Sequence, residues 1–431
     1  MATAAWKRGA FLLGRLLEMG GRGLRVRCLG GSRAGEVRLT RFLRNDAVSI
    51  EEMAHEAAQR TSLRCQGREV LAIQDTTVVR SAGGGGHYLH VTLAVDAQDG
   101  AILGLIDGRF LNRQGDSKSR RHSLPIEAKE SFRWLQGADH AASVCAGAAR
   151  ITVVADREGD IYETFALLPR EVDLVVRAAQ DRSLGDGGRL FATLDGLAEA
   201  GQAELDLPSK PGRAARRARI AVRFMAAELA RPASGSKQDL PAAARMTLID
   251  VCEPDPPPGE VAVHWRLLTT YAVANAAEAW GVIEVYRRRW AIEQVFRTLK
   301  TQGFDIEGLR IAEAAPRNRL VMAALVAAVI VQQLVHARDG GPGPLRPLGD
   351  AFDQEDQRLL EAFCGRLEGK TDRQKNPHPK GSLAYAAWVC ARLGGWTGYY
   401  GKAGPIVMLE GWLQFHAAKK GLSMLTAAIN V

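Results

Sequence analysis

Two aspartates follow short, mostly apolar segments in the amino-terminal half of the chain. Asp75 comes directly after Val70–Gln74, and Asp156 comes directly after Ile151–Ala155. A carboxylate at the end of a buried strand costs desolvation free energy unless a partner compensates it. Ligand sites of open α/β sheets lie at the carboxyl ends of strands, where two such carboxylates repel each other unless a cation joins them. The pattern is typical of an oxygen-only site for Mg²⁺ or Mn²⁺, and two aspartates that merely cap turns are the alternative.

A second group of reactive residue types recurs at steps of three and four between residues 277 and 301. Its members are Tyr286, Arg289, Trp290, Glu293, Arg297 and Lys300. On one continuous helix they would share a stripe. A core-facing stripe is apolar, whereas this one combines a carboxylate, three cations and two aromatic rings. A carboxylate flanked by cations is typical of a metal ligand within a phosphate-binding surface. The alternative is a solvated helix with salt bridges on its surface.

The elements that would position these residues alternate between strands and helices. Strands are predicted at Val70–Gln74, Tyr88–Val95, Ala101–Asp107, Ile151–Ala155 and Val172–Val176, and helices at Ile126–Leu135 and Ile161–Leu168. The strands are apolar or alternating runs, and the helices are amphipathic. This order predicts an α/β fold with a mixed sheet flanked by helices.

Residues 180 to 275 interrupt that scheme. Strands at Ile220–Phe224, Thr247–Val251 and Val261–Leu268 alternate with turns rich in proline and glycine, which predicts an inserted β-rich subdomain. Helices are predicted before and after, at Lys7–Met19, Ser49–Gln59, Ala277–Thr301, Arg317–His336 and over most of 345–431. The helix at Ser49 begins with a capping-box signature, Ser49 followed by Glu52.

The composition is that of a soluble globular protein with an excess of cations. The 431 residues carry a formal net charge of +9, which suits a polyanionic partner, and the length predicts two or three packed units. Six dispersed cysteines give neither a disulfide framework nor a zinc ribbon, so a reducing cytoplasm is expected. No secretory signal is predicted, and the apolar stretch Leu320–Val335 is shorter than a membrane span. We expect no membrane role.

Three collinear motifs resemble a known family. Asp75-Thr76-Thr77 resembles the first-aspartate motif of the insertion-sequence-4 (IS-4) family of DDE transposases, and the segment from Asp156 to Ile161 resembles the second. The Y-R-E-K signature of that family is matched at every spacing by Tyr286, Arg289, Glu293 and Lys300. Shorter likenesses run in order through Phe42–Asn45, Glu127–Ser131, Leu393–Trp396 and Glu410–Trp412. One such motif would be weak, whereas three in order with the full signature spacing are strong. Together with the shorter likenesses they cover most of the chain.

The resemblance implies a ribonuclease-H-like catalytic domain. In it Asp75, Asp156 and Glu293 would bind two Mg²⁺ ions, with Mn²⁺ as a substitute. Contacts to DNA phosphates are implied for Tyr286, Arg289 and Lys300, and for Arg177, whose spacing differs from the family by one residue. Two further positions, Trp265 and Trp290, match those that handle a base flipped from the duplex, and packing in the core is the alternative for both.

The resemblance also divides the chain and names its partners. A shortened, helical DNA-binding region is expected over 1–66, and the catalytic domain over 67–302 with its insertion at about 180–275. The remaining catalytic-domain helices would follow over 303–344, and a helical dimerisation region over 345–431. The partners would be double-stranded DNA, as inverted repeats and as target, and a second copy of the chain in a homodimer. The location would be the bacterial cytoplasm, at the nucleoid.

The function implied is that of a DNA transposase. It would cleave transposon ends in a metal-dependent reaction, through a hairpin intermediate, and transfer the strands into target DNA by cut and paste. Two alternatives stay open: a ribonuclease-H-like nuclease without strand transfer, and an inactive DNA-binding remnant. The complete acidic set favours the transposase, whereas residues 1–20, which do not follow the opening pattern of the family, favour the remnant.

Overall fold

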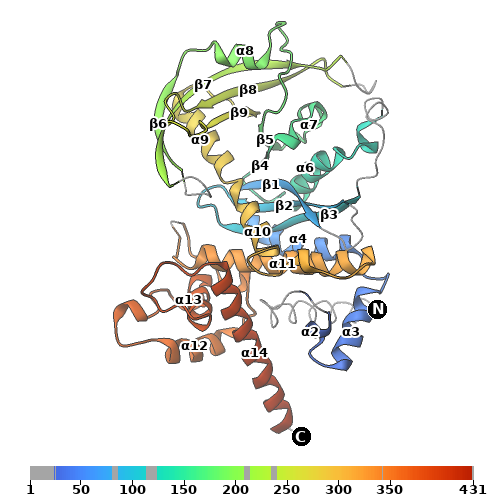
Figure 1. The fold of residues 1–431 in the computed structure, drawn as a ribbon, viewed down its shortest axis with the longest axis vertical. Coiled ribbons are helices and arrows are strands. Elements are labelled where there is room, and N and C mark those ends of the chain that lie inside the picture. Colours follow the sequence, from blue (N-terminus) through green and yellow to red (C-terminus); the bar gives the residue numbers. More distant parts are fainter. Residues whose placement is uncertain are drawn as a thin grey trace. The chain divides into compact units, whose positions relative to one another are not determined.

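The computed structural model describes residue 24 and residues 26–79, 86–112, 124–207, 214–233, 240–341 and 343–429. The predicted helix at Lys7–Met19 lies outside these residues. The chain divides into two compact units (Figure 1). Unit 1 draws on residues 1–66, 76–113 and 290–431, and unit 2 on residues 67–75 and 114–289.

The strands form one mixed sheet. Within the described residues it has nine strands, in the order β3-β2-β1-β4-β5-β9-β8-β7-β6. The strands are β1 Glu69–Val79, β2 His87–Asp96, β3 Ile102–Asn112, β4 Arg150–Ala155, β5 Val172–Arg177, β6 Gly201–Leu207, β7 Arg216–Ala230, β8 Ala243–Cys252 and β9 His264–Thr269. Helices flank this sheet, so the predicted α/β class is confirmed, and the arrangement is consistent with a ribonuclease-H-like fold.

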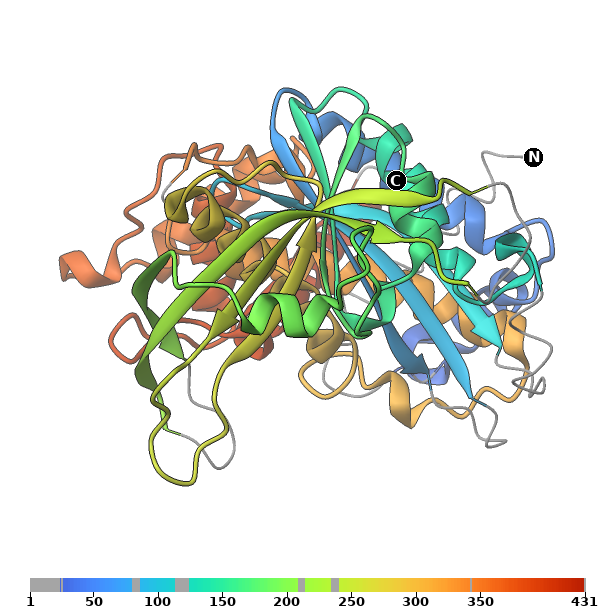
Figure 2. The same ribbon diagram turned by 90° about the horizontal axis from the view of Figure 1, so that it is seen from above.

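Unit 2 is built around parallel pairing. Strand β4 pairs in parallel with the first part of β1 and with β5, and β9 pairs antiparallel with β5. Strands β9, β8, β7 and β6 then continue the sheet as antiparallel neighbours, and Figure 2 shows β7 to β9 as long green-to-yellow arrows side by side. The predicted β-rich segment is therefore joined to the parallel strands by the hydrogen bonds between β5 and β9.

The helices of unit 2 lie between and after these strands. They are α6 Phe132–Val144, α7 Tyr162–Leu167, α8 Leu190–Asp195 and α9 Ala276–Arg287, with short 3₁₀ turns at Ile126–Ala128 and Arg157–Gly159. Helix α9 packs against β4, β5 and β7, and α8 packs against β8. The apolar interiors of β4 and β5 are fully covered, as expected for parallel strands between helices.

Three predicted elements differ from the structure. Strand β1 continues through Asp75 to Val79, because the β-branched Thr76, Thr77 and Val78 extend it. The predicted helix at 126–135 is a 3₁₀ turn followed by α6 from Phe132. The predicted helix at 277–301 is two helices, since an i to i−3 bond from the Arg289 amide to the Tyr286 carbonyl closes a turn at that point.

Unit 1 packs helices against the β2–β3 hairpin. Its helices are α2 Val26–Gly30, α3 Arg33–Leu43, α4 Ile50–Cys65, α10 Trp290–Leu299, α11 Ala314–Ala337, α12 Asp356–Leu367, α13 Leu383–Leu393 and α14 Pro405–Ile429, with 3₁₀ turns at Ile306–Gly308, Leu348–Asp350 and Asp372–Gln374. Helices α4 and α11 both pack on β3. The predicted cap of α4 is confirmed, because the Ser49 hydroxyl accepts a bond from the Glu52 amide at 2.9 Å.

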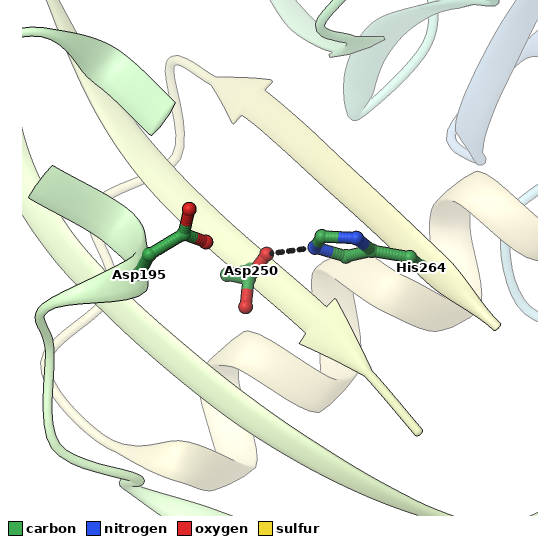
Figure 3. A group of neighbouring side chains, drawn as sticks. All are labelled: Asp195, Asp250 and His264. Carbon is green, nitrogen blue, oxygen red and sulfur yellow. Dashed lines mark hydrogen bonds and ion pairs between the residues drawn. The ribbon is translucent and has the colours of Figure 1, made fainter. Parts of the chain in front are cut away.

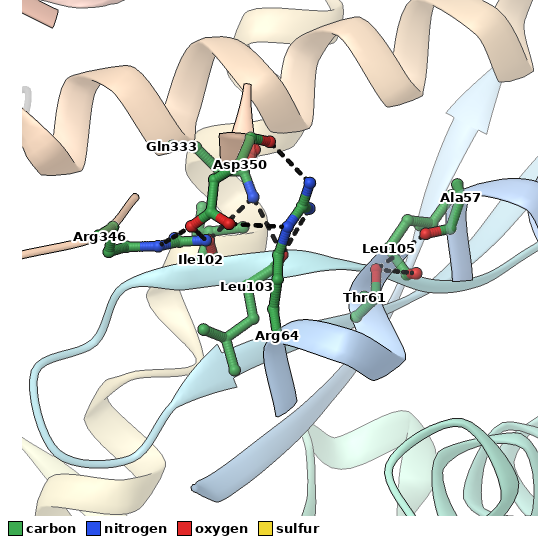
Figure 4. A network of polar contacts seen from close by, with 9 residues as sticks. All are labelled: Ala57, Thr61, Arg64, Ile102, Leu103, Leu105, Gln333, Arg346 and Asp350. Atoms are coloured by element: carbon green, nitrogen blue, oxygen red, sulfur yellow. Dashed lines mark hydrogen bonds and ion pairs between the residues drawn. The ribbon is translucent and has the colours of Figure 1, made fainter. Parts of the chain in front are cut away.

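A polar network holds this packing in register (Figure 4). The carbonyl of Leu103 accepts bonds from Arg64 of α4 at 3.0 Å and from Gln333 of α11 at 3.0 Å. The Arg64 guanidinium also pairs with the Asp350 carboxylate at 3.2 Å, and Arg346 donates to the same carboxylate at 2.6 Å. Arg346 also donates to the Ile102 carbonyl. Two backbone carbonyls at the start of β3 are therefore paired by side chains from three segments, as buried backbone groups require.

Helices α13 and α14 cross closely at two glycines. A Cβ atom on Gly411 would lie 1.6 Å from the Cys390 carbonyl oxygen, and one on Gly394 would lie 2.0 Å from the Val407 carbonyl oxygen. Neither position can hold a larger residue without moving the backbone. The two glycines belong to the Leu393–Trp396 and Glu410–Trp412 segments, so a packing requirement accounts for their pattern. Trp388 of α13 and Trp412 of α14 are buried.

Helix α11 is the most apolar element of the described residues. It is the one helix among them that is long and apolar enough to cross a membrane, and 78% of its most apolar 18-residue window is buried. Burial on this scale is typical of the central helix of a core. The predicted helix at Arg317–His336 is confirmed as α11, and most of the apolar stretch Leu320–Val335 is buried in it.

A largely buried histidine makes unit 1 sensitive to acid. His416 of α14 packs against the rings of Phe352, Trp412 and Phe415. Burial lowers the pKa of His416 to about 4, against the opposing effect of Asp356. The native state therefore keeps the imidazole neutral in a pH range where the unfolded chain protonates it.

We expect the free energy of unfolding to decrease as the pH falls from about 6.5 to about 4, because the unfolded chain then binds a proton that the native state excludes. The loss should be on the order of 2–3 kcal/mol by pH 4.5. Urea unfolding at pH 7.5 and 4.5 measures it, with His416→Phe as the comparison. An equal loss of stability in the variant would show that other groups cause the acid sensitivity.

Candidate active site

Asp75 and Asp156 lie at the same level of neighbouring strands in unit 2. The parallel register of β1 and β4 ends at the pair Gln74 and Ala155, and each aspartate is the next residue along its chain. Asp75 remains within β1, and Asp156 is the amino-terminal cap of the 3₁₀ turn Arg157–Gly159. Their side chains are 25% and 35% exposed. The register thus brings two carboxylates together where a solvent ion can reach them.

Two residues at the end of α9 contact this pair. The Arg289 guanidinium places Nη1 3.2 Å from Oδ2 of Asp75 and Nη2 4.0 Å from Oδ2 of Asp156. The Tyr286 hydroxyl donates to Oδ1 of Asp156 at 3.1 Å. Burial, with the Asp156 charge added, raises the pKa of Tyr286 to about 12. The hydroxyl therefore stays protonated and acts as a donor to the carboxylate.

Trp265 and Arg177 lie beside the same tyrosine. The rings of Trp265 and Tyr286 are 5.7 Å apart and tilted by 60°. Arg177, the last residue of β5, donates to the His264 carbonyl at 3.0 Å, and its charge acts to lower the pKa of Tyr286. Trp265 is partly exposed. Unit 2 thus gathers six of the nine predicted site residues.

The other three predicted residues belong to α10 and its end, in unit 1. Glu293 lies in the first turn of α10 and is partly exposed, and the Lys300 ammonium is 3.6 Å from the Glu307 carboxylate. Trp290 is 48% exposed, and the Arg297 guanidinium lies over its ring at 5.1 Å. Exposure excludes the alternative that Trp290 is a core anchor. The apolar face of α10 packs against α11, which fixes Glu293 on a rigid helix.

A buried ion pair that the sequence analysis did not identify fixes the turn after β4. The Asp160 carboxylate accepts bonds from the amides of Ala179 and Gln180, at 2.7 and 2.9 Å, and from Arg182 Nε at 2.7 Å. Arg182 also donates to the Asp160 carbonyl at 2.7 Å. Both side chains are 5% exposed or less. The pair ties the Asp156-bearing turn to the segment that follows β5, so it holds Asp156 and Arg177 in place.

Gly159 allows this turn to lie against the sheet. A Cβ atom at that position would be 2.7 Å from the Ala155 Cβ and 3.4 Å from the Val176 side chain. The signal available in the sequence was the second aspartate of the Asp156–Asp160 segment, together with the glycine between them. Nothing in the sequence pointed to Arg182 as its partner, because the two lie on different elements.

A separate cluster of possible metal ligands lies elsewhere in unit 2 (Figure 3). Carboxylate oxygens of Asp195 and Asp250 and the His264 imidazole come within 4.8 Å of one another. Arg223 donates to the buried Asp250 at 2.9 Å, and Arg266 donates to Asp195 at 2.6 Å and lies 3.6 Å from Asp250. Asp250 is fully buried, and two guanidiniums and the His264 imidazole already pair with these carboxylates, so the cluster is an ion-pair network and a poor cation site.

The donor set at Asp75 and Asp156 suits a divalent cation better. It offers carboxylate oxygens that are adjacent and partly exposed, which is the chemistry that Mg²⁺ and Mn²⁺ prefer. Beyond them, Tyr286 and Arg289 supply a hydroxyl and a guanidinium that could meet a phosphate. The described part of unit 2 can therefore assemble an anionic metal site next to cationic and aromatic groups.

Comparison with known families shows what the chain is similar to. Residues 84–330, more than half of the 431-residue chain, match the family described as a transposase DDE domain. The matched range contains Asp156, Tyr286, Arg289 and Glu293 and begins nine residues after Asp75.

Proposed function

The chain belongs to the family of transposases that share this DDE domain, and we propose that it cuts and joins DNA at metal ions held by Asp75, Asp156 and Glu293. The observation that carries the proposal is the parallel register that sets Asp75 beside Asp156. Glu293 is added because it follows Arg289 by four residues and matches the signature spacing. An oxygen-only donor set of this kind supports Mg²⁺, with Mn²⁺ as a substitute.

Asp75, Asp156 and Glu293 would hold the divalent ions, and bound ions would supply activation of a water nucleophile and stabilisation of the departing 3′ oxygen. The residues of the chain have the remaining tasks. The Tyr286 hydroxyl holds Asp156 through Oδ1 and so leaves Oδ2 directed at the Arg289 side of the site. Arg289, Lys300 and Arg177 supply positive charge for the phosphates of the DNA end. After the first cut, the freed 3′ hydroxyl would serve as the nucleophile for joining.

The finer assignment is to the IS-4 branch, similar to the Tn-5 transposase, with a cut-and-paste reaction through a hairpin. It is supported by the complete Y-R-E-K spacing and by two tryptophans that suit a flipped base. Trp265 lies beside Tyr286, and Trp290 presents a ring that is 48% exposed. Stacking on an aromatic face contributes roughly 1–3 kcal/mol per base, which offsets much of the cost of unstacking.

The proposed partners are transposon-end inverted repeats, target DNA and a second copy of the chain. The net charge of +9 suits DNA, and we assign end recognition to residues 1–66 and the catalytic domain to 67–344, with its insertion at about 180–275. Dimerisation is assigned to residues 345–431. In Figure 1 the carboxyl-terminal part of α14 extends beyond α12 and α13, and its side chains Leu422, Met424 and Leu425 are exposed. A soluble, DNA-acting enzyme would work in the bacterial cytoplasm at the nucleoid.

The flipped-base proposal makes a prediction for Trp265. We expect Trp265→Ala to slow double-strand breakage by about 10-fold to 100-fold, because the stacking energy is lost, while the first nick proceeds at nearly the wild-type rate. Gel analysis of nicked and hairpin products over time measures both steps. Trp265→Phe keeps an aromatic face and should retain most of the second step. Equal slowing of both steps would show that Trp265 supports the fold of the site instead.

The function is tested with a labelled DNA duplex that carries the inverted repeat flanking the gene. Incubated with the full chain and Mg²⁺, it should give nicked, hairpin and joined products. Cut products without joining would favour the nuclease, and binding without cutting would favour the inactive remnant. A duplex with a scrambled repeat is the matched control, because a nonspecific nuclease would cut it equally well.

A further inference from the structure

Arg289 lies between the two carboxylates rather than beside one of them. Its two terminal nitrogens face Oδ2 of Asp75 at 3.2 Å and Oδ2 of Asp156 at 4.0 Å, and its side chain is only 13% exposed. Two carboxylates at adjacent positions of neighbouring strands repel each other, and a partly buried guanidinium at these distances offsets that repulsion. Arg289 is therefore part of the electrostatic balance of the aspartate pair, in addition to any contact with DNA.

We propose that Arg289 is a built-in counter-ion that competes with divalent cations for Asp75 and Asp156, so that DNA binding and metal binding reinforce each other through this side chain. This inference rests on the proposed function. A cation held by the same two Oδ2 atoms would face the positive guanidinium at close range, which lowers its affinity. When a DNA phosphate binds the guanidinium, its positive charge no longer repels the cation. The affinity of the two aspartates for the metal then rises.

The local structure suits such an exchange. The Asp75 contact at 3.2 Å is long for a charge-assisted bond. Arg289 lies in the turn between α9 and α10, and its side chain can change partners by rotation about its own bonds. Tyr286 holds Asp156 through the other carboxylate oxygen, so Asp156 stays in place when the guanidinium moves. By linkage, a ligand that binds the released arginine raises the affinity for the competing cation. The cation raises the affinity for that ligand by the same factor.

The test measures Mn²⁺ binding to the full chain by electron paramagnetic resonance, for the wild type and for Arg289→Gln. Without DNA, we expect Arg289→Gln to bind Mn²⁺ about tenfold more tightly, since it removes a positive charge near the ligands. A duplex that ends at the terminal nucleotide of the element should tighten Mn²⁺ binding to the wild type, and should add little in the variant. Arg287→Gln, on α9 and paired with Glu284, is the matched control and should behave like the wild type.

The outcomes separate this inference from the proposed function. Weaker or unchanged Mn²⁺ binding by Arg289→Gln would overturn the inference, because the arginine would then be arranging the ligands or taking no part in metal binding. If the wild type binds Mn²⁺ and Asp156→Asn abolishes the binding, the metal site stands whichever way the arginine behaves. If Asp156→Asn leaves Mn²⁺ binding intact, the metal site of the proposed function is wrong, and the inference falls with it. Melting of the metal-free protein adds a second readout: Arg289→Gln should melt at a lower temperature, and excess Mn²⁺ should restore it.

Discussion

Asp156→Asn should reduce DNA cleavage by about 1000-fold or more while leaving the affinity for DNA close to that of the wild type. The carboxylate sits where the β1–β4 register meets Tyr286 and Arg289, and the amide of asparagine is neutral and a poor ligand for a hard cation. Losing the metal removes several kcal/mol of transition-state stabilisation, and about 1.4 kcal/mol corresponds to tenfold in rate. Cleavage of the labelled duplex under single-turnover conditions measures the loss.

Asp206→Asn is the matched control for this substitution. Asp206 is an exposed aspartate of unit 2 whose surface pair with Arg217 contributes little to stability, so the control should cleave normally. If Asp156→Asn cuts DNA within tenfold of the wild type, Asp156 is not a metal ligand. If it loses both cleavage and its melting transition, the residue is structural.

Asp160→Asn should lower the free energy of unfolding of unit 2 by about 3–5 kcal/mol, the loss expected when one member of a buried ion pair is removed. Arg182 would keep its charge in a site that is 5% exposed, and the amides of Ala179 and Gln180 would lose a charged acceptor. Hydrogen exchange followed by mass spectrometry should show faster exchange in the peptide that covers residues 177–184, together with a lower melting temperature.

The double variant Asp160→Asn with Arg182→Met tests whether the ion pair supports stability alone or also supports cleavage. It removes the unpaired charge and should recover most of the lost stability, because replacing a whole buried pair is often nearly neutral. Its cleavage should still be slower than that of the wild type, since the turn bearing Asp156 is no longer tied to the segment after β5. Wild-type cleavage by the double variant would show that the pair serves stability alone.

The sequence was sufficient for the strands of the catalytic core and for the residue types of the site. Runs such as Ile151–Ala155 and Val172–Val176 form strands that are largely buried on both faces of the sheet. Such a strand is apolar along its length, so it can be recognised from the sequence of that one segment. Asp156 could be placed at the end of β4 for the same reason. The family match is consistent with this reading and covers Asp156 and Glu293.

The features that could not be predicted from the sequence depend mostly on contacts between segments far apart in the chain. The break between α9 and α10 has neither glycine nor proline at Arg288 and Arg289, so nothing local marks it. A charged residue such as Asp75 predicts the end of an apolar strand, whereas β1 continues to Val79 because the threonines that follow favour a strand. Asp160 precedes β5 in the chain and Arg182 follows it. Their ion pair is therefore evident only in the folded structure.

Cleavage of the polypeptide by bound iron tests the proposed metal site most directly. Fe²⁺ replaces Mg²⁺ in sites with oxygen ligands, and with ascorbate and peroxide it cuts the backbone next to the ion. We expect fragments that end near Asp75, Asp156 and Glu293, suppressed by excess Mg²⁺ and absent in Asp156→Asn. Cuts near Asp195, Asp250 and His264 instead, or cuts that Mg²⁺ does not suppress, would contradict the proposed active site.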